Sequence, residues 1–402
     1  MTKLSVKNVG PIKGGCADPY ILFDSLTVFL GPQSAGKSTI AKIYASLAWL
    51  EKAILRDEIV VEQWGKSDFF LQEVISFQGI ASYFRDDSYV HYIGEGCDFT
   101  YESGHFSVNV KEDKNNYKMP KIMYVPAERN FLTSISGPEL MTRLPRPLHA
   151  FLAEYEYAKE WTQRRDIILP IGEIQYRYDS DKNKSYLIGQ DYETDLLHGS
   201  SGYQSFIPLF LVTEYLSNLV LNDENDPSRE MYSVARIRKI KDKLDSILKT
   251  KDINSKVREL IRISSKYDYG CFVNVVEEPE QNLYPESQKK ALFSLFEALK
   301  LNDKNKLVVT SHSPYVLNFI ILATEAYNLY SKKLSEESKE KLQTIVPKGS
   351  ALDINQVHVY ELDGQGGIVE LSKSEGFLTD ANQLNFAFEE INQSFSDMME
   401  LN

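Results

Sequence analysis

Short runs that are rich in bulky apolar residues alternate with stretches that have helical apolar spacing along this chain. Residues 25–30 form one such run, and residues 40–49 after it carry apolar side chains three and four positions apart. Two further runs of this kind, 270–276 and 305–310, are each followed by polar residues. Runs with apolar residues at consecutive positions are typical of strands that are buried on both faces. The pattern therefore predicts a parallel core sheet with helices packed on both of its sides.

Other stretches alternate apolar and polar residues and predict strands that pair antiparallel. Residues 90–93 and 106–110 predict an antiparallel subsheet, and residues 171–178 and 185–192, separated by a polar turn, predict a hairpin. Near the end of the sequence, residues 356–362 and 367–371 predict paired strands. A helix is expected from just after residue 312 to about residue 333.

The segment from residue 31 to residue 39 matches G-x-x-x-x-G-K-[ST] at every fixed position, between the first apolar run and the first helix. Glycines let the backbone aim successive N–H groups at phosphate oxygens, and the start of the helix adds a favourable field. Lys37 is expected to reach the β and γ phosphates of a nucleotide, and Ser38 to hold Mg²⁺. The predicted nucleotide-binding residues are Gly31, Gln33, Ser34, Ala35, Gly36, Lys37, Ser38 and Thr39.

Two carboxylates follow the apolar run 270–276. A rigid strand that ends in acidic residues can present them to the Mg²⁺ that phosphates carry. Glu277 is expected to be the Mg²⁺-side carboxylate, acting through water, so that the predicted metal ligands are Ser38 and Glu277. Glu278 is expected to be the base that orients or deprotonates the attacking water.

His312 lies just beyond the run 305–310. A lone histidine is more often structural, but the ends of neighbouring parallel strands converge at one edge of a doubly wound sheet. At that edge, His312 could hydrogen-bond the γ-phosphate or the attacking water. The predicted catalytic residues are therefore Glu278 and His312.

Composition and charge exclude several classes of protein. The 402 residues are 43% hydrophobic and 25% charged, no apolar run approaches a membrane span, and the first residues lack the apolar core of a signal peptide. A cytoplasmic protein without a membrane partner is expected. The three cysteines are far apart, which predicts neither a disulfide framework nor a zinc site. The net charge of −12 argues against a chain that coats nucleic acid over its whole surface.

One basic segment departs from this acidic balance. Residues 229–266 contain twelve Lys or Arg against five Asp or Glu, with apolar residues at helical spacing. Two interpretations remain open: a solvated helical hairpin with ordinary surface lysines, or a surface that contacts DNA or a protein partner.

Four of these landmarks occur in an order that resembles a known family. Residues 4–13, the segment 31–39, residues 276–285 and residues 310–317 are similar to the motifs of ATP-binding-cassette-like ATPases of the structural-maintenance-of-chromosomes, RecF and overcoming-lysogenization-defect type. The resemblance implies an α/β P-loop ATPase head, with a mostly parallel core sheet, an antiparallel β subsheet and a helical insertion. It also implies ATP and Mg²⁺ as cofactors.

Domain boundaries follow from the same resemblance. One split ATPase head is expected over residues 1–402. Residues 1–225 would form an N-terminal lobe with the phosphate loop, the subsheet and a signature motif, and residues 226–267 a basic helical insertion. Residues 268–402 would form a C-terminal lobe with the carboxylates, the histidine and the last strands.

Residues 198–205 resemble the signature loop of this family, whose register could begin at Ser200 or at Ser201. The resemblance implies that this loop caps the γ-phosphate of ATP held by another subunit, which predicts a homo-oligomer with composite ATP sites. The residues implied are Ser200, Ser201, Gly202 and Gln204.

Three positions qualify the resemblance. The family commonly has Asp at the position of Glu277 and His at that of Tyr284, so hydrolysis is expected to be slow. Arg129 has two interpretations, an approach to phosphate or the subunit interface and a structural ion pair.

The sequence also limits the function. Only ninety residues follow His312, and they contain no Asp-x-Asp motif of a nuclease domain. The chain resembles the ATPase subunits of two-gene anti-phage systems such as PARIS and Septu. That resemblance implies a switch or sensor that controls a separately encoded effector, a nuclease or a toxin. The alternative is a RecF-like or chromosome-associated ATPase in DNA repair or chromosome maintenance, with DNA contacts through residues 229–266. A transporter motor is disfavoured, because nothing in the sequence indicates a membrane partner.

Overall fold

The computed structural model describes residues 1–59, 69–133, 144–163, 165–221, 269–374, 377–379 and 382–400. The predicted insertion 226–267, and the basic segment 229–266 within it, lie outside the described residues. At the centre of the fold is a seven-stranded sheet in the order β2-β16-β15-β4-β14-β13-β8. Its strands are β2 (Gly15–Cys16), β16 (Gly367–Glu370), β15 (Val357–Leu362), β4 (Leu26–Leu30), β14 (Lys306–Ser311), β13 (Cys271–Glu277) and β8 (Pro120–Val125).

Five neighbouring strands of this sheet, from β15 to β8, are parallel, whereas β16 pairs antiparallel with β15. Their register brings the carboxyl ends level, with Glu277 opposite Thr310 and Ser311 opposite Leu30. The polar residues that follow the parallel strands therefore lie at one edge of the sheet, the edge formed by the carboxyl ends of these strands.

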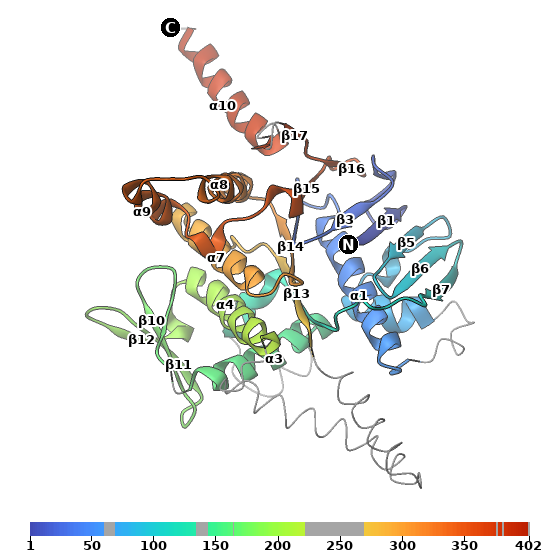
Figure 1. The fold of residues 1–402 in the computed structure, drawn as a ribbon, viewed down its shortest axis with the longest axis horizontal. Coiled ribbons are helices and arrows are strands. Elements are labelled where there is room, and N and C mark those ends of the chain that lie inside the picture. Colours follow the sequence, from blue (N-terminus) through green and yellow to red (C-terminus); the bar gives the residue numbers. More distant parts are fainter. Residues whose placement is uncertain are drawn as a thin grey trace.

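Both faces of the central sheet are covered, which explains why its strands are apolar at consecutive positions. On one side, Phe29 and Val308 pack with α1 (Lys37–Leu55). On the other side, Val28 and Val309 pack with helices from later in the chain. Those helices are α3 (Arg146–Thr162), α4 (Ser201–Val220), α7 (Pro285–Lys300) and α8 (Pro314–Tyr330), with α9 (Glu336–Ile345) at their edge (Figure 1).

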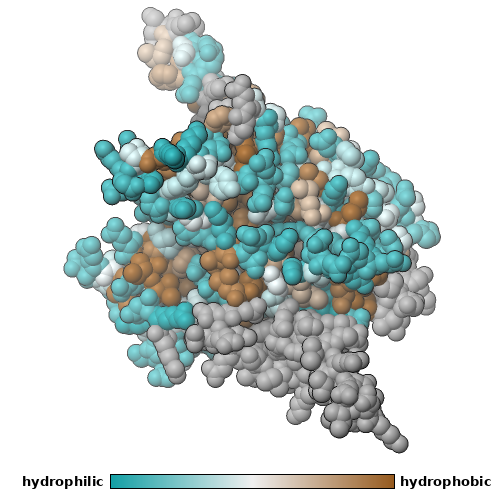
Figure 2. Space-filling model, viewed as in Figure 1, coloured by the Kyte–Doolittle hydropathy of each residue, from teal (hydrophilic) through white to brown (hydrophobic). Residues whose placement is uncertain are grey.

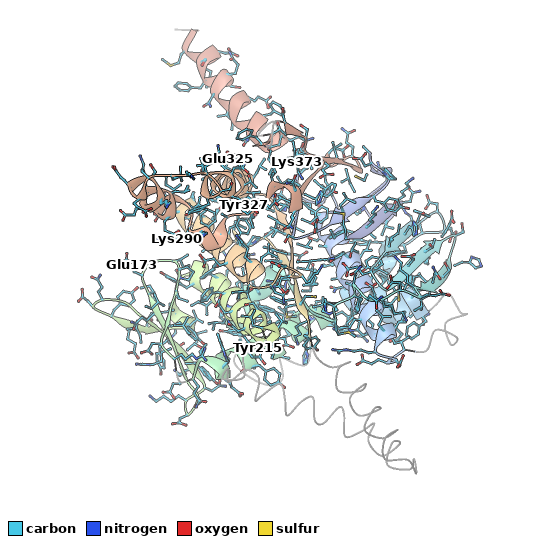
Figure 3. The ribbon with its side chains drawn as sticks, viewed as in Figure 1. Glu173, Tyr215, Lys290, Glu325, Tyr327 and Lys373 are labelled. Carbon is cyan, nitrogen blue, oxygen red and sulfur yellow. The ribbon has the colours of Figure 1, made fainter. Side chains whose placement is uncertain are left out.

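The helices on this second side pack against one another through large side chains. The rings of Tyr215 on α4 and Trp161 on α3 lie 6.2 Å apart between centroids, and Figure 3 marks the position of Tyr215. The expected α/β fold, with its mostly parallel core sheet, is confirmed.

Two antiparallel sheets flank the core. The first, in the order β3-β1-β5-β6-β7, lies beside α1 and confirms the predicted subsheet (Figure 1). Its strands are β3 (Ile21–Phe23), β1 (Thr2–Lys7), β5 (Tyr89–Ile93), β6 (Cys97–Glu102) and β7 (His105–Val110). The second has the order β12-β11-β10-β9, formed by β12 (Glu193–Asp195), β11 (Lys184–Ile188), β10 (Gln175–Asp179) and β9 (Ile167–Ile168).

The predicted hairpin is confirmed as β10 and β11, but its first strand begins four residues later than expected. Gly172 and Glu173 have φ angles of 69° and 53°, a left-handed turn that a strand cannot contain. The terminal pair β15 and β16 is also confirmed, and α8 ends at Tyr330, three residues before the expected end.

Short helices connect these elements, and the chain ends in a long one. The short ones are η2 (Phe70–Ile75), η3 (Ser76–Gln78), η4 (Ala81–Tyr83), η5 (Ala127–Thr133), η6 (Leu196–His198), η7 (Lys348–Ser350) and η8 (Ile354–Gln356). After the strands β17 (Lys373–Ser374) and β18 (Phe377–Leu378), helix α10 (Gln383–Glu400) extends away from the body (Figure 1). Within the part of the chain that the structure describes, no helix has both the length and the apolar character that crossing a bilayer requires.

Candidate functional site

Four strand ends meet at the carboxyl edge of the central sheet. The loop 31–36 follows β4, Glu278 follows β13 and His312 follows β14. On the far side of β13, η5 follows β8 and brings Arg129 to the same edge. An edge of this kind, where parallel strands end between helices, is where ligands bind in open α/β sheets.

The phosphate loop has a backbone that only glycine accommodates at two positions. Gly31 has a φ of 138°, and a Cβ atom there would lie 2.4 Å from the carbonyl oxygen of Leu362. Gly36 has a φ of 106°, and a Cβ atom would lie 2.9 Å from Cγ1 of Ile12. Gly36 also precedes the 19-residue helix α1, and no side chain caps the helix there. The first N–H groups of α1 are thus left for an anion at this terminus.

The remaining predicted loop residues surround this turn. Gln33 and Ser34 are exposed, and Ala35 is buried. At the start of α1, Ser38 is half-buried and Thr39 is buried. A ligand can therefore reach Gln33, Ser34 and Ser38 directly. Thr39 is buried and is not open to a ligand in this way.

Lys37 is buried at the centre of the site. Its Nζ atom donates to the carbonyl oxygens of Gly31 and Pro32, both at 2.8 Å, and lies 3.2 Å from Nδ1 of His312. Burial lowers the pKa of Lys37 to about 8, against the opposing effect of nearby Glu278 and Glu280. The loop thus holds a cation by its own carbonyl groups, close to where the loop N–H groups would bind phosphate.

His312 joins Lys37 to Glu278. An ammonium group can only donate, so Nδ1 of His312 accepts from Lys37 and the neutral ring carries its proton on Nε2. That Nε2 atom lies 3.3 Å from Oε1 of Glu278. The three side chains, from three different strand ends, form one line of polar contacts along the edge.

Glu278 itself lies in an unusual backbone conformation, with a φ of 44°. Such a conformation costs a non-glycine residue on the order of 1–3 kcal/mol and is often found at functional sites. The hydrogen bond from His312 is the main cause that holds the pKa of Glu278 below its ordinary value. The carboxylate is therefore ionised at neutral pH, and while His312 donates to it the group is a weaker base than a free glutamate.

Glu277 is buried, and one of its oxygens has no hydrogen bond of normal length. Oε2 accepts a hydrogen bond from the backbone N–H of Ala127 at 3.2 Å, while Oε1 is unpaired; the hydroxyl of Tyr124, whose pKa is raised by burial and by this carboxylate, is its neighbour. A buried carboxylate oxygen left unpaired is costly, and a small shift of that hydroxyl or a metal-bound water would satisfy it. The donor set of Ser38, Glu277 and phosphate oxygens suits Mg²⁺, which keeps several of its waters. In the described ranges, no three His, Cys, Asp or Glu side chains gather into a metal site, so phosphate would have to supply ligands.

Glu280 is a site residue that the sequence did not single out. Its Oε1 atom accepts hydrogen bonds from Oγ of Ser311 at 2.6 Å and from the backbone N–H of His312 at 3.0 Å. Burial raises the pKa of Glu280. It fixes the turn that carries His312, and its only signal in the sequence is its place three residues after Glu277.

Arg129 is completely buried and clamps the carboxyl edge together. Its guanidinium group donates to the carbonyl oxygens of Glu277 and Glu278, each at 2.6 Å, of Ser205 at 3.0 Å and of Pro126 at 3.3 Å. Burial lowers its pKa to about 10. Neither interpretation from the sequence is confirmed as it was made: Arg129 has a structural role, but among the described residues its hydrogen-bond partners are carbonyl groups rather than the carboxylate of an ion pair.

The signature-like segment lies at the start of α4, the 20-residue helix that contains Ser205. Ser200 and Ser201 are exposed there, whereas Gly202 is buried and a Cβ atom would lie 2.9 Å from the carbonyl oxygen of Asn282. Gln204 donates back to the carbonyl oxygens of Leu196 and Leu197. Within the described residues, these contacts attach the segment to its own neighbours and to the turn after Glu280, not to the phosphate loop.

Comparisons with known proteins give structural matches only. No protein-family model and no curated protein matches the sequence. Among solved structures, the chain is similar to an SMC head domain from Thermotoga maritima, with 11% identity, a TM-score of 0.37, and 92% of this chain and 98% of that chain covered. It is also similar to an SmcHead bound to the C-winged helix domain of ScpA, with 10% identity, a TM-score of 0.41, and 93% and 98% covered.

A third similar structure is the dimeric post-hydrolysis state of the ATP-binding cassette MJ0796 bound to ADP and Pi. Its identity is 10%, its TM-score 0.29, and 92% of this chain and 96% of that chain are covered. At these identities and TM-scores, the likeness assigns no role to any residue of this chain.

Proposed function

We propose that this chain binds ATP with Mg²⁺ and hydrolyses it slowly. The observation that carries the proposal is the line of contacts from Lys37 through His312 to Glu278, beside a glycine-dependent loop at the start of α1. A buried cation that can contact phosphate and an ionised carboxylate that can orient water are parts that phosphoryl transfer to water uses, and His312 connects the two.

Each of these residues has one task in the proposed reaction. When bound, ATP supplies the phosphoryl group and Mg²⁺ neutralises charge on its oxygens. Lys37 would exchange its contacts with Gly31 and Pro32 for phosphate oxygens, and Ser38 and Glu277 would hold the metal side of the site. Glu278 would accept the proton of the attacking water. His312 would orient the carboxylate of Glu278 by donating a hydrogen bond from Nε2–H.

We further propose that the ATP site is completed by a second copy of the chain. Ser200 and Ser201 support this, because they are exposed at the N-terminus of a long helix, where a phosphate would be stabilised. In such an assembly, ATP binding would join two heads and hydrolysis would release them. Such an ATP-dependent change of assembly could act as a switch or sensor that controls a separate effector, in the manner of two-gene anti-phage systems.

A second candidate function rests on the basic segment 229–266. Twelve Lys or Arg against five Asp or Glu favour a DNA-binding ATPase of the repair or chromosome-maintenance type. That function requires sequence-independent DNA binding that weakens with salt and is lost when Arg236, Arg238, Lys239 and Lys241 are neutralised. Failure to bind duplex DNA at low salt contradicts it.

The test of hydrolysis is the variant Glu278→Gln, which keeps the size of the side chain and removes its basicity. We expect ATP binding near the parent value and a turnover rate lower by about 10²–10⁴-fold, the usual contribution of a general base. The release of phosphate measures the rate of hydrolysis, and calorimetry measures the affinity for ATP. Glu286→Gln removes an exposed carboxylate that pairs with Lys290 at 3.3 Å and serves as the matched control. Turnover by Glu278→Gln at the parent rate would show that another group is the base.

A further inference from the structure

Helix α10 leaves a row of apolar side chains uncovered. It extends from the body, and its second half makes side-chain hydrogen bonds that stay within the helix, such as those from Gln393 to Asp397 and from Ser394 to the carbonyl of Glu390 (Figure 1). Its exposed apolar residues are Phe386, Ile391, Phe395, Met398 and Met399, each between 54% and 65% exposed. Apolar side chains are visible on this part of the molecular surface (Figure 2). Large apolar side chains that gather on one element mark an interaction surface.

The spacing of these residues indicates the kind of surface. Ile391, Phe395 and Met398 are separated by four and then three positions, the alternation that places side chains along one seam of a two-helix coiled coil. With Phe395 at heptad position a, Ile391 and Met398 occupy position d. The same spacing would also let a helix lie in an apolar groove, so the choice between a groove and a second helix rests on the charges of α10.

The charges of α10 fit a second copy of the same helix. The positions that flank the seam, e and g, hold Asn392, Ser394 and Met399, none of which is charged. The carboxylates of Glu390 and Asp397 occupy the outer position c. Two identical helices can therefore pair with their acidic side chains in water, and like charges do not meet across the interface.

We propose that α10 pairs with α10 of a second copy of this chain and tethers two copies without nucleotide. A helix of 18 residues is short for an independent coiled coil, so the pair would be of modest strength. A modest tether is nevertheless sufficient to raise the effective concentration of one head for the other. The idea that this tether helps to assemble a composite ATP site rests on the proposed function. The pairing of the two α10 helices does not rest on it.

The test is sedimentation velocity of the full chain in the absence of nucleotide. We expect a concentration-dependent dimer, and the double variant Ile391→Asp/Phe395→Asp should raise its dissociation constant at least about 100-fold, because two charges would be buried in the seam. Gln393→Asp adds one carboxylate, half the charge of the double variant, at outer position f and should leave the constant within about threefold. A double variant that dimerises like the parent, or a parent that is monomeric at tens of micromolar, overturns the proposal.

A second pair of substitutions tests the same seam in the opposite direction. Leucine at position d favours two-stranded pairing, so Ile391→Leu/Met398→Leu should tighten the dimer by at least about threefold. A misfolded variant cannot produce that result, and an unchanged or weaker dimer contradicts the assigned seam. Lys37→Ala should keep the dimer while losing ATP binding, so failure of the tether and failure of the ATPase proposal are separable.

Discussion

Lys37 is a cation with little access to water, and its surroundings decide how it responds to pH. The residue is 5% exposed, and its ammonium group is held by two loop carbonyls and His312. Burial disfavours the charged form, whereas a bound triphosphate would favour it. The positive charge of Lys37 is therefore easily lost from the ligand-free chain.

The affinity for ATP should consequently fall as the solution becomes more alkaline. Because burial lowers the pKa of Lys37 to about 8, the protonated form predominates below that pH and declines above it. We expect the dissociation constant for ATP with Mg²⁺ to rise by about tenfold between pH 7 and pH 9, as one pKa unit corresponds to a factor of ten. Lys37→Arg, which stays charged over this range, should bind more weakly overall but with a flat profile. Equal parent affinities at both pH values would contradict the assignment.

The sequence predicts some side chains of the site and misses others for a physical reason. The glycines of the loop are recognisable because a backbone with φ near 138° at Gly31 leaves few alternatives. Glu280 is not recognisable, because its role depends on Ser311 and His312, which come from another strand. Arg129 is ambiguous for the same reason, since its partners are backbone carbonyls brought together only by the fold.

Among the elements, β8, β13 and α4 meet at Arg129. The clamp connects the end of β13, at Glu277 and Glu278, to the carbonyl of Ser205 in α4 and to that of Pro126 after β8. Carbonyl groups left unpaired in a buried place are costly. The position of both site carboxylates therefore depends on a side chain that does not take part in the chemistry.

Arg129→Ala should destabilise the protein by at least about 2 kcal/mol, because it leaves several buried carbonyl groups without a donor and each such group costs about 1–3 kcal/mol. The free energy of unfolding in urea measures this. Arg177→Ala is the matched control, because Arg177 and Glu193 form an ion pair at 2.8 Å in which both side chains are 45% exposed. Its effect should stay below about 1 kcal/mol. Similar losses for both variants would show that the clamp contributes little.

Element types were predictable where one interaction dominates. The apolar runs that became β4, β13 and β14 were recognised as strands because both of their faces are buried. The predicted start of β10 was four residues too early, because the left-handed turn at Gly172 and Glu173 has no unique signal in the sequence. Helix α10 was not predicted, although Ile391, Phe395 and Met398 recur at helical spacing and so gave a signal in the sequence itself.

At the scale of the whole molecule, the strand order and the assembly lie beyond the sequence pattern. Alternating strands and helices predict a mostly parallel sheet, but the order β15-β4-β14-β13-β8 follows from packing between segments far apart in the chain. That order places β4 beside β14, which brings Lys37 to His312. The proposed composite site and the proposed α10 tether both require a second copy, which is a property of the assembly rather than of one chain.

The central claim is that the edge formed by β4, β13 and β14 binds ATP with Mg²⁺. Calorimetric titration of the parent chain and of Lys37→Ala with ATP and Mg²⁺ tests it directly. We predict saturable binding to the parent at one site per chain, and a loss of at least about 100-fold in affinity for Lys37→Ala, which removes a charge-assisted contact to phosphate. No binding by the parent at millimolar ATP, or equal binding by Lys37→Ala, would contradict the account.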